Sequence, residues 1–486
     1  MRAFNQAKPF NQIVQAALLS VCLLSACTVG PDYVKPAMDV PAAFKEQQGW
    51  KVAQPKDELP RGKWWEIFGD STLNQLIEQV EVSNQNLRIV EAQYRQAQAL
   101  AQQAGAAYYP AVTGGVSATR SRAGNTNGTT GVSSSNINTT YNLNAGVSWE
   151  ADLWGSIRRS VEAGSASAEA SAADIEAAKL SAQAELAQDY FLLRIADARK
   201  VLLDDTVAAY EKSLQLTQNQ YNVGVAARAD VVTADTQLKS AKAQAADVGV
   251  QRAQLEHAIA ILIGKTPAEF SMAPLSSKFE LLPPQIPLGM PSQLLERRPD
   301  IAAAERRAAS ANAKIGVAEA AFYPDLTLSA EAGFKSTSFA KWLTFPARFW
   351  TLGPALAQTI FDGGLRKAQT AQAVAVYDQS VATYRQTVLG GFQEVEDNLA
   401  ALRILEQEAA LQDEAVKSAR ESVQITTNQY KAGIVNFLNV VNVETIALDN
   451  QRTALTIQSN RLSASVLLIK ALGGGWKASD LHSSKG

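Results

Sequence analysis

The sequence carries one long pattern twice, with the second copy about 210 residues after the first. Residues 219–224 read NQYNVG, and residues 428–433 read NQYKAG. Residues 153–159 read LWGSIRR, and residues 361–367 read FDGGLRK. Each copy is predicted to follow the order helix, β-hairpin, long helix, turn, helix. The duplication therefore constrains the architecture more than any single motif does.

Each copy is predicted to end in two very long helices that meet at a sharp turn, at residues 221–228 and 430–437. After the second turn, positions spaced by three and four residues form the seam of a coiled coil. These positions are Leu438, Val441, Thr445, Leu448, Arg452, Leu455, Ser459, Leu462, Val466 and Ile469. The turn residues are Tyr221, Gly224, Tyr430 and Gly433. We expect both glycines to stop their helices with positive φ.

Each copy also contains a predicted β-hairpin, at about 111–153 and 325–361. Between Thr140 and Leu153, apolar and polar residues alternate strictly. Such alternation is expected where one face of a strand meets lipid and the other meets water. An antiparallel sheet on a soluble core would alternate in the same way, so the pattern alone leaves both interpretations open.

Aromatic residues gather where the predicted helices meet the predicted strands. They include Tyr109, Trp154, Tyr323 and Phe361. This placement is typical of the aromatic belt at a membrane interface. Ordinary packing at a helix–strand corner is the alternative.

The N-terminus has the features of a secretion signal. Arg2 and Lys8 precede an apolar stretch at 13–24, and small residues lead to Cys27. This arrangement resembles a bacterial lipoprotein signal, in which residues 1–26 are removed and Cys27 is acylated. An ordinary secretory peptide is the alternative. No later stretch reaches the roughly 18 apolar residues of a transmembrane helix, so any membrane crossing would use strands.

Composition argues against several classes of function. The formal net charge is −2, and it becomes −4 without Arg2 and Lys8, so nucleic-acid binding is not expected. Gly264-Lys265-Thr266 lacks the earlier glycine of a phosphate-binding loop. Neither catalytic nor metal-ligand spacing is found, so we expect no enzyme, metal or dissociable cofactor.

Four strands per chain cannot close a barrel alone, because the smallest outer-membrane barrels use about eight. Open strand edges in lipid would leave backbone groups unpaired at a cost of several kcal/mol each. The long helices are rich in Ala, Ser, Thr and Gln, which suits a wall facing water better than a solid bundle. The sequence therefore predicts an α+β membrane protein in which several chains share one barrel, continued by a hollow helical tube.

Five motifs resemble those of the outer membrane efflux factors (the TolC-like family), in its lipoprotein branch. They are GPDY at 30–33, RRPDI at 297–301, AAFYP at 320–324, FDGG at 361–364 and LGGGW at 472–476. The resemblance covers essentially the whole mature chain. It implies a homotrimer with one twelve-stranded barrel in the outer membrane, a periplasmic α-helical barrel, and an N-acyl diglyceride on Cys27.

The resemblance also implies an exit duct that works with a periplasmic adaptor and an inner-membrane transporter of the RND type. The turns would then be candidates for adaptor docking and for the gate. Leu438 and Asn442 occupy the family's constriction positions, although relatives commonly carry an acidic residue where Asn442 stands. Asp230 and Asp235 could supply negative charge instead. Alternatively, Leu438 is an ordinary seam residue and the aspartates lie on solvated faces.

The predicted domain order is a signal at 1–26, an acylated strap at 27–70, a first repeat at 71–266, a Pro-rich linker at 267–291, a second repeat at 292–473 and a tail at 474–486. Three acidic residues on the helices, Glu305, Glu394 and Glu396, are expected to form surface or intersubunit ion pairs. The alternative function is a lipid-anchored coiled-coil scaffold or adaptor without a pore.

Overall fold

The computed structural model of the chain describes residues 28–46, 62–122, 137–275, 279, 281–286 and 291–476. They form two compact units: the first contains residues up to 37, 94–170 and 304–384, and the second contains 38–93, 171–303 and 385–486. Each unit therefore takes segments from both copies of the repeat. Four helices contribute to both units: α3 (Gln85–Ala106), α4 (Ser156–Asn222), α7 (Pro299–Ala320) and α8 (Leu365–Lys431).

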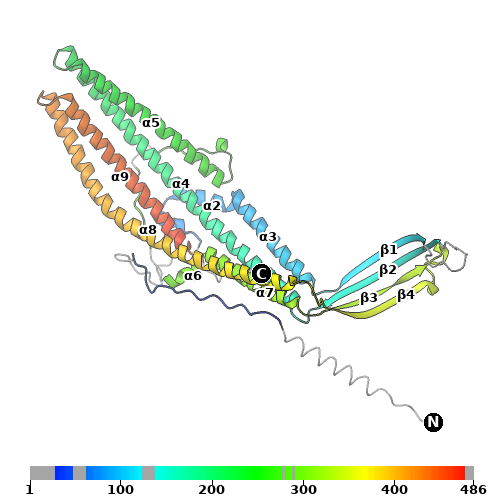
Figure 1. The fold of residues 1–486 in the computed structure, drawn as a ribbon. Coiled ribbons are helices and arrows are strands. Elements are labelled where there is room, and N and C mark those ends of the chain that lie inside the picture. Colours follow the sequence, from blue (N-terminus) through cyan, green and yellow to red (C-terminus); the bar gives the residue numbers. More distant parts are fainter. Residues whose placement is uncertain are drawn as a thin grey trace, which may run out of the picture. The chain divides into compact units, whose positions relative to one another are not determined.

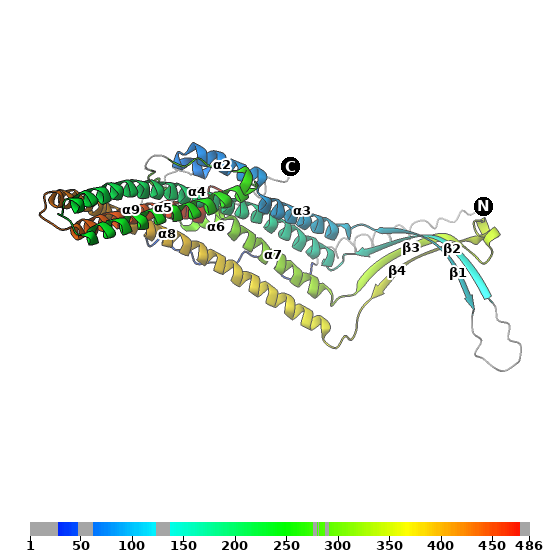
Figure 2. The same cartoon turned by 90° about the horizontal axis from the view of Figure 1, so that it is seen from above.

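The first unit contains one antiparallel sheet in the order β1-β2-β3-β4 (Figure 2). The strands are β1 (Ala111–Arg122), β2 (Ile137–Ala151), β3 (Asp325–Ser336) and β4 (Arg348–Ala357). The β2–β3 ladder pairs the hairpin of the first copy with that of the second, over Tyr141↔Ser336 to Ala151↔Leu326. The sheet thus joins the two repeats, and β1 and β4 are its edges in the described chain.

One face of this sheet is apolar across all four strands. Val112 lies opposite Val147, Val147 opposite Ala330, and Ala330 opposite Leu352. Directly opposed residues share a face, so these side chains form one continuous row. Val112 is 72% exposed and Leu352 is 76% exposed. The other face carries polar groups, including Asn144, whose Nδ2 donates to Glu331 Oε1 at 2.7 Å.

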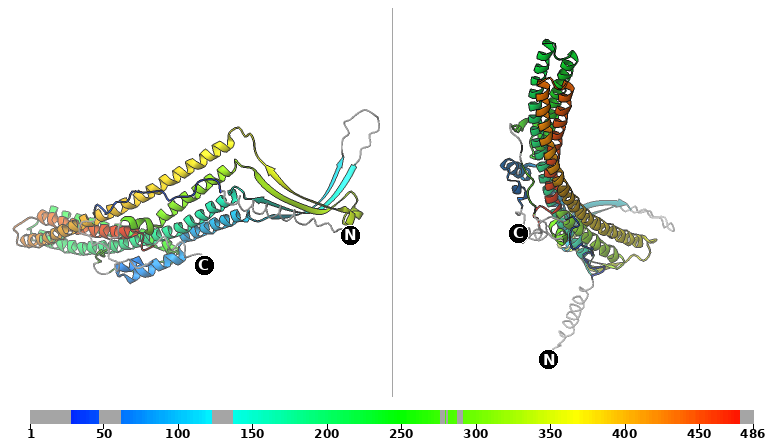
Figure 3. Two further views of the ribbon diagram at one scale, coloured as in Figure 1. Left: turned by 90° about the horizontal axis from the view of Figure 1, so that it is seen from below. Right: turned by 90° about the vertical axis from the view of Figure 1, so that its left-hand side faces the viewer.

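The second unit contains two long helical hairpins, which lie along one another in both views of Figure 3. In one, α4 meets α5 (Arg228–Leu262); in the other, α8 meets α9 (Phe437–Ala471) (Figure 1). The core also receives the 3-10 helix η1 (Trp64–Phe68) and α2 (Ser71–Ser83). Its largest fully buried side chains include Trp64, Trp65, Tyr190, Phe191, Leu73 and Ile77. Asp70 caps α2 by accepting from the N–H groups of Thr72 and Leu73.

The first repeat begins with two helices rather than one, because Asn84 separates α2 from α3. Its ψ of 123° is extended, and its side-chain oxygen accepts from the N–H of Leu87. The Asn84 amide also donates to the carbonyl of Leu262 at 2.8 Å. This partner is 178 residues away, so local periodicity could not reveal the break.

The Pro-rich linker contains two 3-10 turns, η2 (Pro267–Glu269) and η3 (Pro291–Gln293), and leads to α6 (Leu294–Arg297). Its first part is fixed by a buried ionic group. Arg252 donates to Asp197 at 2.7 Å, and the Asp197 carboxylate also accepts from the backbone N–H of Leu275. Among the helices described, none has the length and apolar character needed to cross a membrane.

Candidate functional site

Both helix turns end in the same backbone motif. Gly224 has φ +79° and Gly433 has φ +74°, as predicted. The N–H of Val225 donates to the carbonyl of Gln220, and that of Ile434 donates to the carbonyl of Gln429. Each bond is the wider of the two backbone hydrogen bonds in a Schellman cap, which spans six residues. The cap needs one residue in the left-handed conformation, and glycine adopts that conformation without steric cost. At each turn, backbone hydrogen bonds therefore end the helix.

The two turns differ in how they are packed. Tyr430 is buried and its ring lies 5.5 Å from that of Phe437. The Tyr430 hydroxyl is 3.4 Å from Thr217 Oγ1 on α4. Tyr221, at the matching position of the first turn, is 40% exposed. The second turn is therefore held against the first hairpin, and its fully buried Phe437 is a residue that the sequence patterns did not single out.

The four gate candidates lie in different surroundings. Leu438 is 56% exposed and Asn442, one turn further along α9, is also exposed. Asp230 accepts from the N–H of Ala227 at 3.2 Å and caps α5. Asp235 forms an ion pair of 2.6 Å with Lys239. The structure thus gives both aspartates local partners and leaves Leu438 and Asn442 on the open surface of the single chain.

Asp230 is also brought within electrostatic reach of Tyr430. Burial raises the pKa of Tyr430, the hydrogen bond with Thr217 opposes the rise, and Asp230 adds to it. A residue at the first turn therefore adds a small contribution to the pKa of a residue at the second turn.

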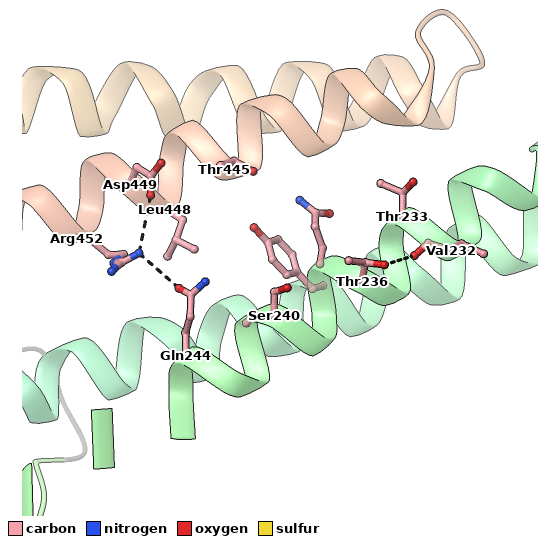
Figure 4. Close-up of a pocket in the computed structure, with 12 residues that line it drawn as sticks. Val232, Thr233, Thr236, Ser240, Gln244, Thr445, Leu448, Asp449 and Arg452 are labelled. Atoms are coloured by element: carbon pink, nitrogen blue, oxygen red, sulfur yellow. Dashed lines mark hydrogen bonds and ion pairs between the residues drawn. The ribbon is translucent and has the colours of Figure 1, made fainter. Parts of the chain in front are cut away.

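A polar cleft of about 340 Å³ lies between α5 and α9, near these turns (Figure 4). Hydroxyl, amide and charged side chains line much of it: Tyr210, Thr233, Thr236, Gln237, Ser240, Gln244, Thr445, Asp449 and Arg452. Arg452 lies 3.4 Å from Gln244 Oε1 across the cleft and 4.0 Å from Asp449 on its own helix. Burial raises the pKa of Tyr210 to about 12, and Glu444 and Asp449 add to the rise.

Glu444 is an acidic residue that the sequence patterns missed. It follows Asn442 by two positions on α9, and its Oε2 atom is buried without a hydrogen-bond partner in the described structure. Burial raises the pKa of Glu444 to about 7. The sequence did offer one sign of it, because Glu444 is an acidic residue within the stretch that carries the coiled-coil seam of the last helix.

The aromatic residues at the helix–strand junctions are only partly brought together. The Trp154 and Tyr323 rings stack at 4.7 Å, and Trp154 Nε1 donates to the carbonyl of Pro324. Tyr109 is 75% exposed and Phe361 is 88% exposed. The stacked pair joins the two copies at the base of the sheet.

The strap that follows the predicted lipid site is fixed to the same corner. Cys27 lies outside the described residues, but the N–H of Val29 donates to the carbonyl of Trp154 at 3.1 Å. Asp32 pairs with the buried Arg159 at 2.8 Å. Asn312 donates to the carbonyl of Pro31 at 2.9 Å. Residues 28–33 therefore contact both copies of the repeat.

The expectation that Glu305 forms a surface or intersubunit ion pair is wrong. Glu305 is buried and accepts from the Tyr33 hydroxyl at 2.6 Å, while Arg306 donates to both of its oxygens. Burial alone would raise the pKa of Glu305, but the hydrogen bonds from Arg306 and Tyr33 outweigh burial and lower the pKa. No group of His, Cys, Asp and Glu in the described chain could hold a metal ion.

Comparison with known proteins assigns this architecture. A model of the outer membrane efflux protein family matches residues 76–265 and 290–474. The probable efflux pump outer membrane protein TtgC of Pseudomonas putida is 30% identical, over 93% of this chain and 94% of that protein. The pyoverdine export outer membrane protein OpmQ of the same species is 31% identical, over 95% and 97% of the two chains. The solved outer-membrane channel OprN has a TM-score of 0.84 and 31% identity, over 93% of this chain and all of that one.

The match covers both repeats, the sheet and both turns. The chain belongs to the outer membrane efflux protein family, and it is an outer membrane exit duct of an efflux pump.

Proposed function

We propose that three copies of the chain form the duct, by joining their four-stranded sheets into one twelve-stranded barrel. The observation that carries this proposal is the exposed apolar face that runs from Val112 on β1 to Leu352 on β4. In lipid, that face is stable only if the backbone groups of both edge strands are paired. Pairing β4 of one copy with β1 of the next satisfies both edges.

The helical hairpins extend the duct into the periplasm, and a periplasmic adaptor meets it at the turns around Gly224 and Gly433. An inner-membrane transporter of the RND type supplies the solute. The duct itself conducts passively, without a catalytic step. The names of the related proteins mention pyoverdine, toluene and antibiotics. We assign small organic solutes, drugs among them, to this chain.

Conductance in a planar lipid bilayer tests the duct. Purified full-length protein should form pores of defined conductance and should run as a trimer in light scattering with detergent correction. A monomeric species, or a trimer without pores, would favour the scaffold function instead.

Leu438 and Asn442 form the constriction in this proposal, because they are exposed one turn apart at the turn end of α9. Leu438→Ala should raise single-channel conductance, and Asn442→Asp should increase the preference for cations. Asp230→Asn and Asp235→Asn test the alternative source of charge. Unchanged conductance and ion selectivity in all four variants would rule out this gate.

Lipid attachment at Cys27 is the remaining part of the proposal. It is supported by the strap, which fixes Thr28 and Val29 beside Trp154 at the base of the sheet. Metabolic labelling with palmitate should mark the wild-type chain and not Cys27→Ser. Labelling that persists in the variant would exclude this site.

A further inference from the structure

Helix α8 carries two adjacent glycines, Gly390 and Gly391, in the interior of a helix of 67 residues. Glycine is less favourable inside a helix than every residue except proline, because its backbone loses the most freedom there. Helix α4, the equivalent helix of the first copy, also has 67 residues but holds only Gly164. A Cβ atom on Gly164 would lie 3.1 Å from Ala101 Cα, so close packing accounts for that glycine.

Packing accounts for only one glycine of the pair in α8. A Cβ atom on Gly391 would lie 3.3 Å from Arg298 Nε and 3.4 Å from its Cδ, so the guanidinium group needs a small residue there. A Cβ atom on Gly390 would meet nothing within 4 Å in the described structure. Alanine would fit at 390 within the single chain and would favour the helix, so Gly390 adds backbone freedom that packing in this chain does not require.

Arg298 binds α8 immediately after the glycine pair. Its Nη1 donates to Glu394 at 2.6 Å and to the carbonyl of Ala471 at 3.1 Å. Its Nε and Nη2 donate to Asp300 at 3.1 Å and 2.6 Å. The buried guanidinium group thus joins the start of α7, the middle of α8 and the end of α9.

The strap forms hydrogen bonds with the next turn of α8. Glu396 accepts from the backbone N–H groups of Lys45 and Glu46 at 2.7 Å and 2.9 Å. Arg403 pairs with the Glu46 carboxylate at 2.6 Å. Beyond residue 393, α8 is therefore held from two sides, whereas its residues up to Tyr384 belong to the other compact unit.

We propose that Gly390 and Gly391 form the flexion point of α8, and that the ion pair between Arg298 and Glu394 is its latch. When the latch opens, the helix bends at the glycine pair. Helix α4 lacks such a pair, so the proposed bend is specific to α8. The consequence for conduction rests on the proposed duct, in which bending α8 moves the Leu438 and Asn442 constriction.

Gly390→Ala tests the flexion point, and Gly249→Ala is the matched control. Gly249 also lies inside a long helix, α5, and a methyl group added there would meet nothing within 4 Å. Hydrogen exchange of the full-length protein should be at least fivefold faster at 386–396 than in the α4 segment 177–187. Gly390→Ala should slow exchange at 386–396 about fivefold, the effect of about 1 kcal/mol, and Gly249→Ala should leave that segment unchanged.

Glu394→Gln tests the latch, since it keeps the shape of the side chain and removes its charge. Exchange at 386–396 should become severalfold faster, and Gly390→Ala in the same chain should reverse the gain. In bilayers, Gly390→Ala should lower the opening frequency about fivefold and Gly249→Ala should not change it.

Wild-type exchange at 386–396 that is as slow as at 177–187 would overturn the flexion point. Equal effects of the two alanine variants on opening frequency would overturn its role in conduction. A protein without pores would instead contradict the duct, and hydrogen exchange would still decide whether α8 bends.

Discussion

The hydroxyl group of Tyr33 donates a hydrogen bond of 2.6 Å to the carboxylate of Glu305, although 272 residues separate the two in sequence. The bond fixes the strap, which precedes the first copy, to α7 of the second copy. Arg306 completes the site by binding the same carboxylate and by lying 5.9 Å from the Tyr33 ring. The part of the strap up to Ala37 is therefore a structural part of the first unit.

Tyr33→Phe should destabilise the strap. The change keeps the ring near Arg306 but removes a hydrogen bond to a charged, buried acceptor, at a cost of about 1.5–3 kcal/mol. Limited proteolysis should then cut earlier near residues 34–46. Tyr221→Phe removes a hydroxyl from an exposed side chain and serves as the control. Equal proteolysis of both variants would contradict this role of Tyr33.

Asp197→Asn should be among the most destabilising single substitutions. Its carboxylate is buried between Arg252, at 2.7 Å, and Arg194, at 3.3 Å. Neutralising one partner of a buried ion pair costs about 3–5 kcal/mol, because the remaining charge loses its compensation. Asp204→Asn breaks an exposed pair with Lys200 and should cost about 1 kcal/mol or less. Urea unfolding of both variants compares these costs directly.

Gly433→Ala should destabilise the second turn through the backbone alone. Its φ is +74°, and a methyl group would meet nothing within 4 Å. The left-handed conformation costs a residue with a Cβ atom about 1–2 kcal/mol. Gly433→Asn should cost less, because asparagine tolerates this conformation better. Thermal unfolding that ranks alanine above asparagine in stability would contradict the backbone explanation.

Glu444 should make stability depend on pH. Its pKa in the folded chain is about 7, above the ordinary 4.5, so the folded state binds the proton more tightly than the unfolded state. Between these values the free energy of unfolding falls as the pH rises, by about 3 kcal/mol at most. Glu444→Gln should therefore stabilise the protein at pH 8 and leave it unchanged at pH 4.

Urea unfolding at pH 4, 6 and 8 measures this dependence. Glu421→Gln changes an exposed carboxylate on α8 and is the matched control. A stability profile that keeps its slope between pH 4.5 and 7 in Glu444→Gln would show that another group causes it.

The repeat, the alternation in the strands and the coiled-coil seam were readable in the sequence because they depend on local spacing. Gly224 and Gly433 are examples: a glycine after a long helical pattern predicts a left-handed stop, and both glycines have positive φ. The motifs also pointed to the family, since they lie at the ends of elements that recur in both copies.

Contacts between distant residues could not be read in the same way. Asn84 breaks a helix by bonding to Leu262, and Glu305 is buried because Tyr33 and Arg306 satisfy it. Tyr221 and Tyr430 have the same local sequence context, yet only Tyr430 is buried.

The sequence by itself determined the order of elements, the turns and the alternating faces, since each follows from neighbours within a few positions. Only the tertiary structure decided which carboxyl groups are buried, which turn packs against the other hairpin and where Arg298 binds α8. Those outcomes depend on which side chains meet across the long helices, and spacing along one chain does not encode that pairing.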